Sequence, residues 1–491
     1  MLPSRPVPHA LSVVVVLVVA ALVAVAAGVW LRVVRYAPYF SFDADQDVRY
    51  PLPGAASLPV TIDAGEEGTS FVWPEAEGPF DTALLEVKLA CSKLGRVLDP
   101  SVEATLAGSD ARTVQYLVRG TDGVRYVNLS ALARRRPAPG ARVRLSGRNA
   151  TVAPGAATLH LMRSPGAAQG PVLVVAPHPD DAELSSFGLY AARAQGHAAA
   201  DASDAWVVTV TAGEVGTFGH PYGGLLGDGV EASRTRGRLR VWESLTAPFV
   251  GRVPAEHAMN LGYFDGTVEA MRRAPDTAVR SSAADVDSID AFRRYNRPGV
   301  TPPSPERATW RGLVADLAAV LARAHPSVIV APHPMLDVHS DHVAVGLAVM
   351  EAIERAGLTD GTLLLYVIHD KGSGPYGSLQ PVGPRDGVVS LPPARFDAPI
   401  ADRIYSSPVS TEQRRMKLFA LDAFRDLRSV QTGLTPSVPA AVTAALRDVY
   451  RRLVVPDASF YRRAVRPNEL FFVIDLEEVP AYRAQFEREA G

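Results

Sequence analysis

The chain has 491 residues, of which 47% are hydrophobic and 21% charged, the balance of a globular protein with a substantial core. Its 50 basic and 52 acidic residues give a net charge of -2, which excludes the strongly basic character typical of nucleic-acid-binding proteins. The single cysteine, Cys91, excludes an internal disulfide and a thiolate metal site, so any bound metal must be held by His, Asp or Glu.

The first predicted element is an apolar run from Ala10 to Leu31, in which Ser12 is the only polar side chain. About 20 apolar residues match the hydrocarbon thickness of a bilayer, and Trp30 lies at the exit, where aromatic rings favour the interface. We interpret residues 10–31 as a transmembrane anchor that makes the chain a single-pass membrane protein. A cleaved signal peptide is the alternative, although its apolar core is normally only about 7–15 residues long. The few flanking arginines leave the side of the membrane open.

Residues 32–50 are predicted to be a tether, and residues 51–163 a separate all-β domain. In the second range, short runs alternate hydrophobic and polar residues with period two, as strands do, and turn signals such as Asp122-Gly123 separate them. The runs are 85–89, 114–118, 124–127, 143–145 and 159–161. This spacing predicts a sandwich-like domain. Its role is left open between a spacer and a saccharide-binding module.

Residues 164–171 are rich in Gly, Pro and Ala and predict a linker to a C-terminal domain at residues 172–491. There, continuous apolar runs predict strands buried on both faces, and helix-like stretches lie between them. The runs are 172–176, 205–210, 327–331 and 363–368, and the helix-like stretches are 231–247, 308–324 and 342–356. This alternation predicts an α/β fold with a mostly parallel sheet and helices on both faces. A proline-rich stretch at 267–306 interrupts it, as a functional loop such as a lid or as disorder.

Clusters of histidine and aspartate follow two of these predicted strands, at residues 177–183 and 332–342. Because the carboxyl ends of parallel strands meet at one edge of a sheet, the fold can bring the clusters together. Imidazole and carboxylate groups bind Zn²⁺, and three protein ligands leave a position for a water molecule that the ion acidifies. Either cluster alone is also compatible with a solvated turn or a helix cap. Two clusters at the ends of buried strands predict a metal-dependent hydrolytic site.

Several motifs resemble those of the LmbE/PIG-L family of zinc-dependent de-N-acetylases. His178-Pro179-Asp180-Asp181 and His339-Ser340-Asp341-His342 resemble its two signature motifs. Further matches are Thr211-Ala212-Gly213-Glu214, Arg240-Val241-Trp242-Glu243, Leu261-Gly262-Tyr263-Phe264-Asp265-Gly266 and a late segment from Lys417 to Gln431. The resemblance covers roughly residues 172–432 and implies a Rossmann-like fold.

The resemblance also implies roles for individual residues. His178, Asp181 and His342 match the family's metal ligands, and Asp180 matches its general base, which deprotonates a water molecule. One zinc ion per chain is therefore expected, although Fe²⁺, Co²⁺ or Mn²⁺ suit the same ligand types.

The remaining implied roles concern the reacting amide and the sugar. His339, when protonated, is expected to stabilise the oxyanion or to protonate the leaving amine, with Asp341 beside it to orient it. Arg240 and Asp265 match positions that contact the sugar.

Some residues depart from the family pattern or lie beside it. Ala182 follows the two aspartates where glutamate is commonest, and Asp337 stands where some members place a catalytic tyrosine. We interpret His333 as structural and Glu214 and Glu243 as stabilising the fold. His220 and His369 are lesser candidates to line the pocket.

The sequence therefore predicts removal of the acetyl group from an N-acetylglucosamine-type glycolipid, glycan or glycoconjugate. The same chemistry on another amide, such as a thiol conjugate or a modified antibiotic, is one alternative. A catalytically silent, membrane-tethered saccharide-binding protein is another. A two-metal phosphatase or nuclease is disfavoured because such sites usually carry more carboxylates.

Overall fold

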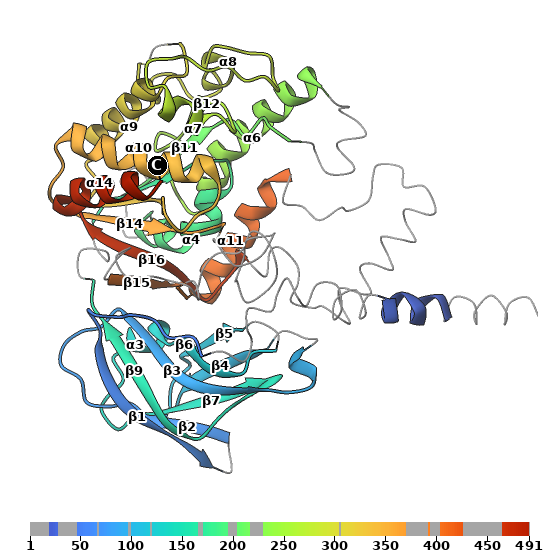
Figure 1. The fold of residues 1–491 in the computed structure, drawn as a ribbon, viewed down its shortest axis with the longest axis vertical. Coiled ribbons are helices and arrows are strands. Elements are labelled where there is room, and N and C mark those ends of the chain that lie inside the picture. Colours follow the sequence, from blue (N-terminus) through green and yellow to red (C-terminus); the bar gives the residue numbers. More distant parts are fainter. Residues whose placement is uncertain are drawn as a thin grey trace, which may run out of the picture.

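A computed structural model describes most of the chain, and its strands form two sheets (Figure 1). The described residues are 19–27, 47–65, 68–96, 100–117, 120–164, 170–194, 204–216, 229–303, 306–369, 391–392, 403–425 and 464–490.

The N-terminal sheet is antiparallel throughout, with strand order β5-β4-β7-β2-β1-β9-β3-β6 and β8 paired to β3. Its strands are β1 (Ala56–Gly65), β2 (Gly68–Val72), β3 (Thr82–Cys91), β4 (Ser101–Leu106), β5 (Arg112–Tyr116), β6 (Gly123–Asn128), β7 (Arg142–Arg148), β8 (Ala150–Val152) and β9 (Gly155–Met162). The long strand β1 pairs with β9 over its first part and with β2 at its end, so the sheet folds over one core. The structure thus has a β-rich region where the sequence predicted one, with the short helix α3 (Ser130–Ala133) inside it, and the predicted domain bounds stay a prediction.

The two faces of strand β3 serve different cores. Leu85 and Val87 belong to the core of the β-domain, whereas Leu84, on the opposite face, belongs to a core of the second domain. Polar contacts join the domains at the same place, where Asn128 donates to Ser406 Oγ at 3.0 Å. The β-domain is therefore packed against the α/β domain rather than held away from it.

The N-terminal predictions are met only in part. The predicted tether ends earlier than residue 50, because Val48 is buried and Tyr50 stacks on Tyr126 at 4.3 Å. Within the described ranges, no helix is both long and apolar enough to cross a membrane. Of the predicted anchor at 10–31 only residues 19–27 are described, as helix, so the anchor is not confirmed.

The C-terminal sheet has the order β12-β11-β10-β13-β14-β16-β15. Its strands are β10 (Val172–Ala176), β11 (Ala205–Thr211), β12 (Ala258–Tyr263), β13 (Val328–Pro332), β14 (Thr362–Tyr366), β15 (Arg403–Pro408) and β16 (Asn468–Asp475). The first five strands in this order, from β12 through β11, β10 and β13 to β14, pair in parallel. Strand β16 runs antiparallel to both of its neighbours, β14 and β15. The predicted mostly parallel sheet is confirmed, while β12, β15 and β16 were not predicted.

Helices cover both faces of this sheet (Figure 1). They are α4 (Asp181–Ala194), α6 (Val230–Val250), α7 (Val268–Arg273), α8 (Asp290–Arg293), α9 (Trp310–Ala324), α10 (Ser340–Ala356), α11 (Thr411–Ala423) and α14 (Val479–Ala490). Alternate residues of β10 face two cores: Leu173 packs with α9 and α10, and Val174 packs with α4 and α11. The stretch at 267–306 is packed onto the first core through Ala284, Ile289 and Phe292.

A buried ion pair fixes helix α4, which carries one of the predicted metal ligands. Lys417 Nζ lies 2.9 Å from Glu469, and both side chains are fully buried. Glu469 also accepts hydrogen bonds from the backbone N–H groups of Gly188 and Leu189, while Lys417 donates to the Leu184 carbonyl. The pair thus satisfies backbone groups of α4 and ties the helix to α11 and β16.

Replacing Lys417 with methionine is expected to destabilise the chain by about 3–5 kcal/mol, because Glu469 is then left buried and charged without its partner. The double variant Lys417→Met with Glu469→Gln should recover part of this loss, since glutamine is neutral and still accepts hydrogen bonds. Urea unfolding of the three proteins measures the difference. Equal stability of the single variant and the wild type would show that the pair contributes little.

Candidate active site

The first histidine–aspartate cluster forms the tight turn between β10 and α4. Asp180 has φ = +111°, a backbone conformation that non-glycine residues rarely adopt and that usually marks a functional constraint. Thr211, at the end of β11, donates its hydroxyl to the Pro177 carbonyl at 2.9 Å. Gly213 packs against the turn and against Arg240: a Cβ atom at this position would lie 3.0 Å from Pro179 Cδ and 2.6 Å from Arg240 Nε. The neighbouring strand end therefore holds the turn in this strained form.

Three donor atoms of the predicted metal ligands converge on one point. His178 Nδ1 lies 3.3 Å from Asp181 Oδ2 and 3.3 Å from His342 Nε2, and the last two atoms are 3.2 Å apart. Zinc at about 2.0–2.1 Å from three tetrahedral ligands would place them about 3.3 Å from one another. All three side chains are buried, and the residues present therefore fit a zinc ion.

Carboxylates on the far side of both imidazoles support the same ligand set. His178 Nε2 lies 3.2 Å from Asp265 and 3.4 Å from Asp341, and His342 Nδ1 lies 3.0 Å from Asp337. A carboxylate beside one ring nitrogen keeps the proton there and turns the lone pair of the other nitrogen toward a metal. The nitrogens whose lone pairs are available to a metal are then His178 Nδ1 and His342 Nε2, the two that converge with Asp181.

The charges of the site favour a bound cation. Burial by itself would lower the pKa of His342, but the carboxylates of Asp337 and Asp181 raise that pKa to about 10. Two other groups of possible ligands share His178: one with His339 and His342, and one with Asp265 and Asp341. We assign these two aspartates to the support of His178, because they face its other nitrogen.

A model of the PIG-L family, described as GlcNAc-PI de-N-acetylase, matches residues 173–353. Residues 173–353 therefore carry a PIG-L family domain. This range contains both clusters and the site residues described above in this subsection. No curated protein matches the chain.

The chain is also distantly similar to several solved structures. An N,N'-diacetylchitobiose deacetylase from Pyrococcus horikoshii is 14% identical and covers 63% of this chain and 85% of its own, with a TM-score of 0.33. A zinc-inhibited teicoplanin deacetylase, Orf2, is 17% identical over 62% of this chain and 98% of its own, with a TM-score of 0.31. A conserved protein from Thermus thermophilus is 21% identical over 62% of this chain and 94% of its own, with a TM-score of 0.29.

Two features of His339 bear on the role expected for it. Its Nδ1 accepts a hydrogen bond from the backbone N–H of Asp341 at 3.3 Å, so the backbone and not the Asp341 carboxylate orients the ring. Burial, with the neighbouring His178 and His342 imidazoles, lowers the pKa of His339 to about 4. His339 is therefore neutral at pH 7, rather than protonated as expected, and carries its proton on Nε2.

The Asp341 side chain binds the backbone of the loop that follows β12. Its carboxylate accepts hydrogen bonds from the backbone N–H groups of Gly266 at 2.7 Å and Val268 at 3.2 Å. It also faces His178 Nε2 at 3.4 Å. Asp341 thus supports the predicted metal ligand His178 and the adjacent loop.

Arg240 and Asp265, the predicted sugar contacts, both lie inside the site. Arg240, on α6, is buried and donates to the Pro179 carbonyl at 2.5 Å and to Asp180 Oδ1 at 3.2 Å. Asp265 lies against His178. The structure thus places one beside the predicted base and the other beside a metal ligand, and their contact with a sugar stays a prediction.

Two residues beside the predicted metal ligand His342 were given too little weight from the sequence. Asp337 is fully buried, and Oδ2, which contacts His342, also accepts the backbone N–H groups of Ile368 and His369 at 3.2 Å. The His369 ring lies 4.9 Å from that of His342. For Asp337, the signal in the sequence was its position two residues before His339 and five before the predicted ligand His342. His220 lies outside the described residues.

Replacing Asp337 with alanine is expected to weaken zinc binding roughly 10- to 100-fold, because His342 loses the carboxylate that fixes its ring and tautomer. Asp337→Asn should lose less, since its amide oxygen still accepts a hydrogen bond. Competition with a chromophoric chelator measures both dissociation constants. An unchanged constant in the alanine variant would contradict this role.

The other buried polar groups support the fold of the PIG-L domain. Glu214 accepts hydrogen bonds from the Asp265 N–H at 3.1 Å and from the Ser281 hydroxyl at 2.6 Å. Glu243 pairs with Arg425, and His333 accepts the N–H groups of Met335 and Leu336. These positions agree with the structural roles expected for all three.

Burial raises the pKa of Glu214 to about 7, so its titration should affect stability. Between about pH 4.5 and 7 the native chain holds a proton here that the unfolded chain has lost. Stability is therefore expected to fall as the pH rises through this range, by on the order of 2 kcal/mol. Glu214→Gln should remove this part of the slope in urea unfolding measured at several pH values. An identical slope in both proteins would contradict the assignment.

Proposed function

We propose that the chain is a zinc-dependent hydrolase that removes the acetyl group from an N-acetylglucosamine-type amino sugar. The observation that carries the proposal is the convergence of His178 Nδ1, Asp181 Oδ2 and His342 Nε2 beside the strained, Arg240-bonded Asp180. The family match to a de-N-acetylase model and the deacetylases among the similar structures agree with it.

A zinc ion held by these ligands would acidify a water molecule and polarise the amide carbonyl. Asp180 accepts the proton of the water as its oxygen bonds to the carbonyl carbon, and the carbonyl electron pair moves onto the carbonyl oxygen. His339, neutral and protonated on Nε2, donates a hydrogen bond to that oxygen. As the C–N bond breaks, Asp180 returns the proton to the nitrogen, and the products are acetate and a free amine.

The arrangement around Asp180 favours this role. Arg240 donates to one carboxylate oxygen at 3.2 Å, which holds the side chain in place. The strained backbone of the turn keeps the proposed base beside the predicted metal ligand Asp181.

The test is acetate release by the full-length chain with one equivalent of zinc. The substrates are N-acetylglucosamine, its oligosaccharides and a glycolipid carrying the same sugar. A thiol-conjugate amide and an acylated glycopeptide antibiotic serve as comparison amides. Release from the sugars supports the proposal, and release only from the comparison amides would assign the same chemistry to another substrate class. A chain that binds sugar without any release would favour the silent saccharide-binding alternative.

We also propose that residues 10–31 anchor the chain in a membrane, on the strength of their length and composition. Carbonate washing of membranes that contain the full chain, beside a chain starting at Asp47, tests this. The full chain should stay in the membrane fraction, and its release by carbonate would refute the anchor.

A further inference from the structure

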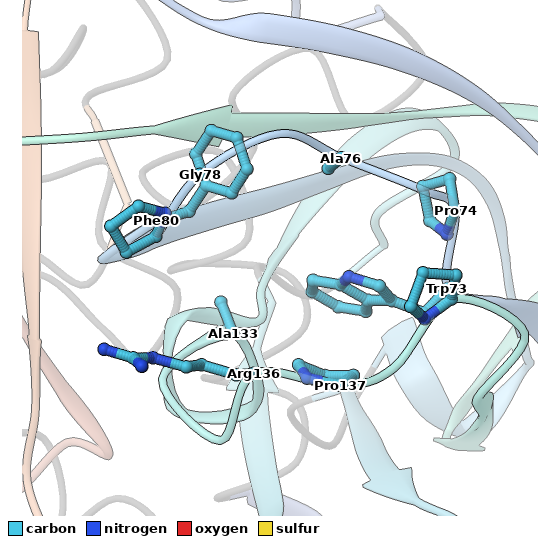
Figure 2. Close-up of a pocket in the computed structure, with 10 residues that line it drawn as sticks. Trp73, Pro74, Ala76, Gly78, Phe80, Ala133, Arg136 and Pro137 are labelled. Atoms are coloured by element: carbon cyan, nitrogen blue, oxygen red, sulfur yellow. The ribbon is translucent and has the colours of Figure 1, made fainter.

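A pocket in the β-domain is separate from the candidate active site at the strand ends of the α/β domain. Its volume is about 350 Å³, and it is lined by ten residues from the loop 73–80 and from the end of helix α3 (Ser130–Ala133) with the loop that follows it (Figure 2). They are Trp73, Pro74, Ala76, Gly78, Pro79, Phe80, Ala133, Arg136, Pro137 and Pro139. Figure 2 shows Arg136 and Pro137 on one side of the pocket, Phe80 and Ala76 on the other, and the Trp73 indole between the two loops. The volume lies at the lower end of the range for small-molecule sites, about 300–1,000 Å³.

The pocket is preformed. The Trp73 N–H donates to the Ala141 carbonyl at 2.7 Å, and the Gly140 N–H donates back to the Trp73 carbonyl at 3.0 Å, so the two loops are joined at their base. Four of the lining residues are prolines, which fix φ and reduce the freedom of the chain. A ligand would therefore bind without first having to order the loops.

The lining combines apolar walls with one positive charge. Arg136 is the only charged residue among those that line the pocket. The loop 73–80 also carries Glu75 and Glu77, but Pro74, Ala76 and Gly78 line the cavity and the two glutamates between them do not. This alternation directs the negative charges of the loop away from the pocket. The pocket suits a ligand with an apolar face and an anionic group.

Arg136 itself shows the features of a binding residue. Its φ is +51°, a left-handed conformation that costs a non-glycine residue free energy and would suit glycine. Its neighbours in the run of three arginines are engaged: Arg134 bonds to Tyr405 at 2.8 Å and Arg135 lies 4.0 Å from Asp110. Among the described residues no side chain pairs with the Arg136 guanidinium. A strained backbone thus presents an unpaired charge at the rim of an apolar pocket.

We propose that this pocket binds a sugar ring that carries an acidic group, as a recognition site distinct from the amide-cleaving site. A pyranose ring presents an apolar C–H face that packs on aromatic and proline rings, and its carboxylate or phosphate pairs with Arg136. The choice of a sugar over another amphipathic anion rests on the proposed function, in which the same chain acts on a saccharide.

Isothermal titration of the full-length chain tests the proposal. The probes are a hyaluronan hexasaccharide, its carboxyl-reduced neutral form, and N-acetylglucosamine 6-phosphate. We expect an acidic probe to bind and the neutral form to bind at least about tenfold more weakly. Preference for the hexasaccharide or for the phosphate identifies the anionic group. Equal binding of the neutral form, or binding of a proline-rich peptide in place of both acidic probes, would overturn the proposal.

Matched variants separate recognition from folding. Arg136→Ala should weaken binding of the acidic probe roughly 10- to 100-fold, whereas Arg135→Ala, which removes the same charge from the adjacent position, should not. Arg136→Gly should lose binding equally while its thermal midpoint stays the same or rises, because glycine relieves the left-handed φ. A lowered midpoint with unchanged binding would show that Arg136 is structural and would refute the proposal.

Acetate release from N-acetylglucosamine distinguishes failure of the two proposals. The small substrate should be hydrolysed at the same rate by the wild type and by Arg136→Ala. Hydrolysis by a wild type that binds no acidic probe would refute the pocket alone. Binding of the acidic probe by a chain that releases no acetate from any sugar would refute the proposed hydrolysis and leave the pocket supported.

Discussion

Asp180→Asn is expected to lower kcat by about 10²- to 10⁴-fold while the chain still binds one zinc ion. Asparagine keeps the shape of the side chain and can still accept the hydrogen bond from Arg240, but it cannot take a proton from water. The ligand atoms of His178, Asp181 and His342 are untouched by this change. Steady-state kinetics and zinc content measured on the same preparations give both values.

The control for this variant is a carboxylate outside the site. Asp276 is exposed and pairs with Arg311, so Asp276→Asn changes the same group without touching the site. It should leave kcat unchanged. An Asp180→Asn protein that retains full activity would remove Asp180 as the base, and one that loses its zinc would move Asp180 into the metal shell.

His342→Gln is expected to abolish both zinc binding and activity. The variant loses one of the three convergent donor atoms and leaves the carboxylates of Asp181 and Asp337 buried without the imidazole between them. Zinc content should fall from one ion per chain to almost none. The rise in thermal midpoint that zinc gives to the wild type should also disappear, because that rise reflects binding to the native state.

His333→Gln is the matched control for this second prediction. His333 is equally buried and directly follows β13, but its ring packs against Phe472 at 5.1 Å. This variant should lose stability and keep one zinc ion per chain. Loss of zinc in His333→Gln, or its retention in His342→Gln, would contradict the assignment of the ligands.

The sequence predicted the centre of the α/β fold well because local and global signals agree there. The run at 172–176 is apolar at every position, and such a run has few alternatives to a strand covered on both faces. Strand β16 was missed although residues 470–474 form a continuous apolar run, and β15, which pairs with β16, has a mixed sequence that gives a weaker signal. In the β-domain, β1 was missed although Leu58, Val60 and Ile62 recur at period two and pack on the core. Pro59 within this run weakens the strand signal.

The site was predictable in its residue types but not in its hydrogen bonds. The motif spacing predicted which histidines and aspartates meet at the strand ends. It could not show that the Asp341 carboxylate turns to the loop at Gly266, or that the backbone at Asp341 holds His339. The role of Asp337 depends on contacts with residues 368 and 369, some 30 positions away along the chain, and is visible only in the folded structure.

The most direct test of the account is anomalous diffraction at the zinc absorption edge from crystals grown with one equivalent of zinc. We predict a single strong peak about 2.0–2.1 Å from His178 Nδ1, Asp181 Oδ2 and His342 Nε2. A peak between His178 Nε2, Asp265 and Asp341, or no peak in the strand-end site, would contradict the proposed metal centre.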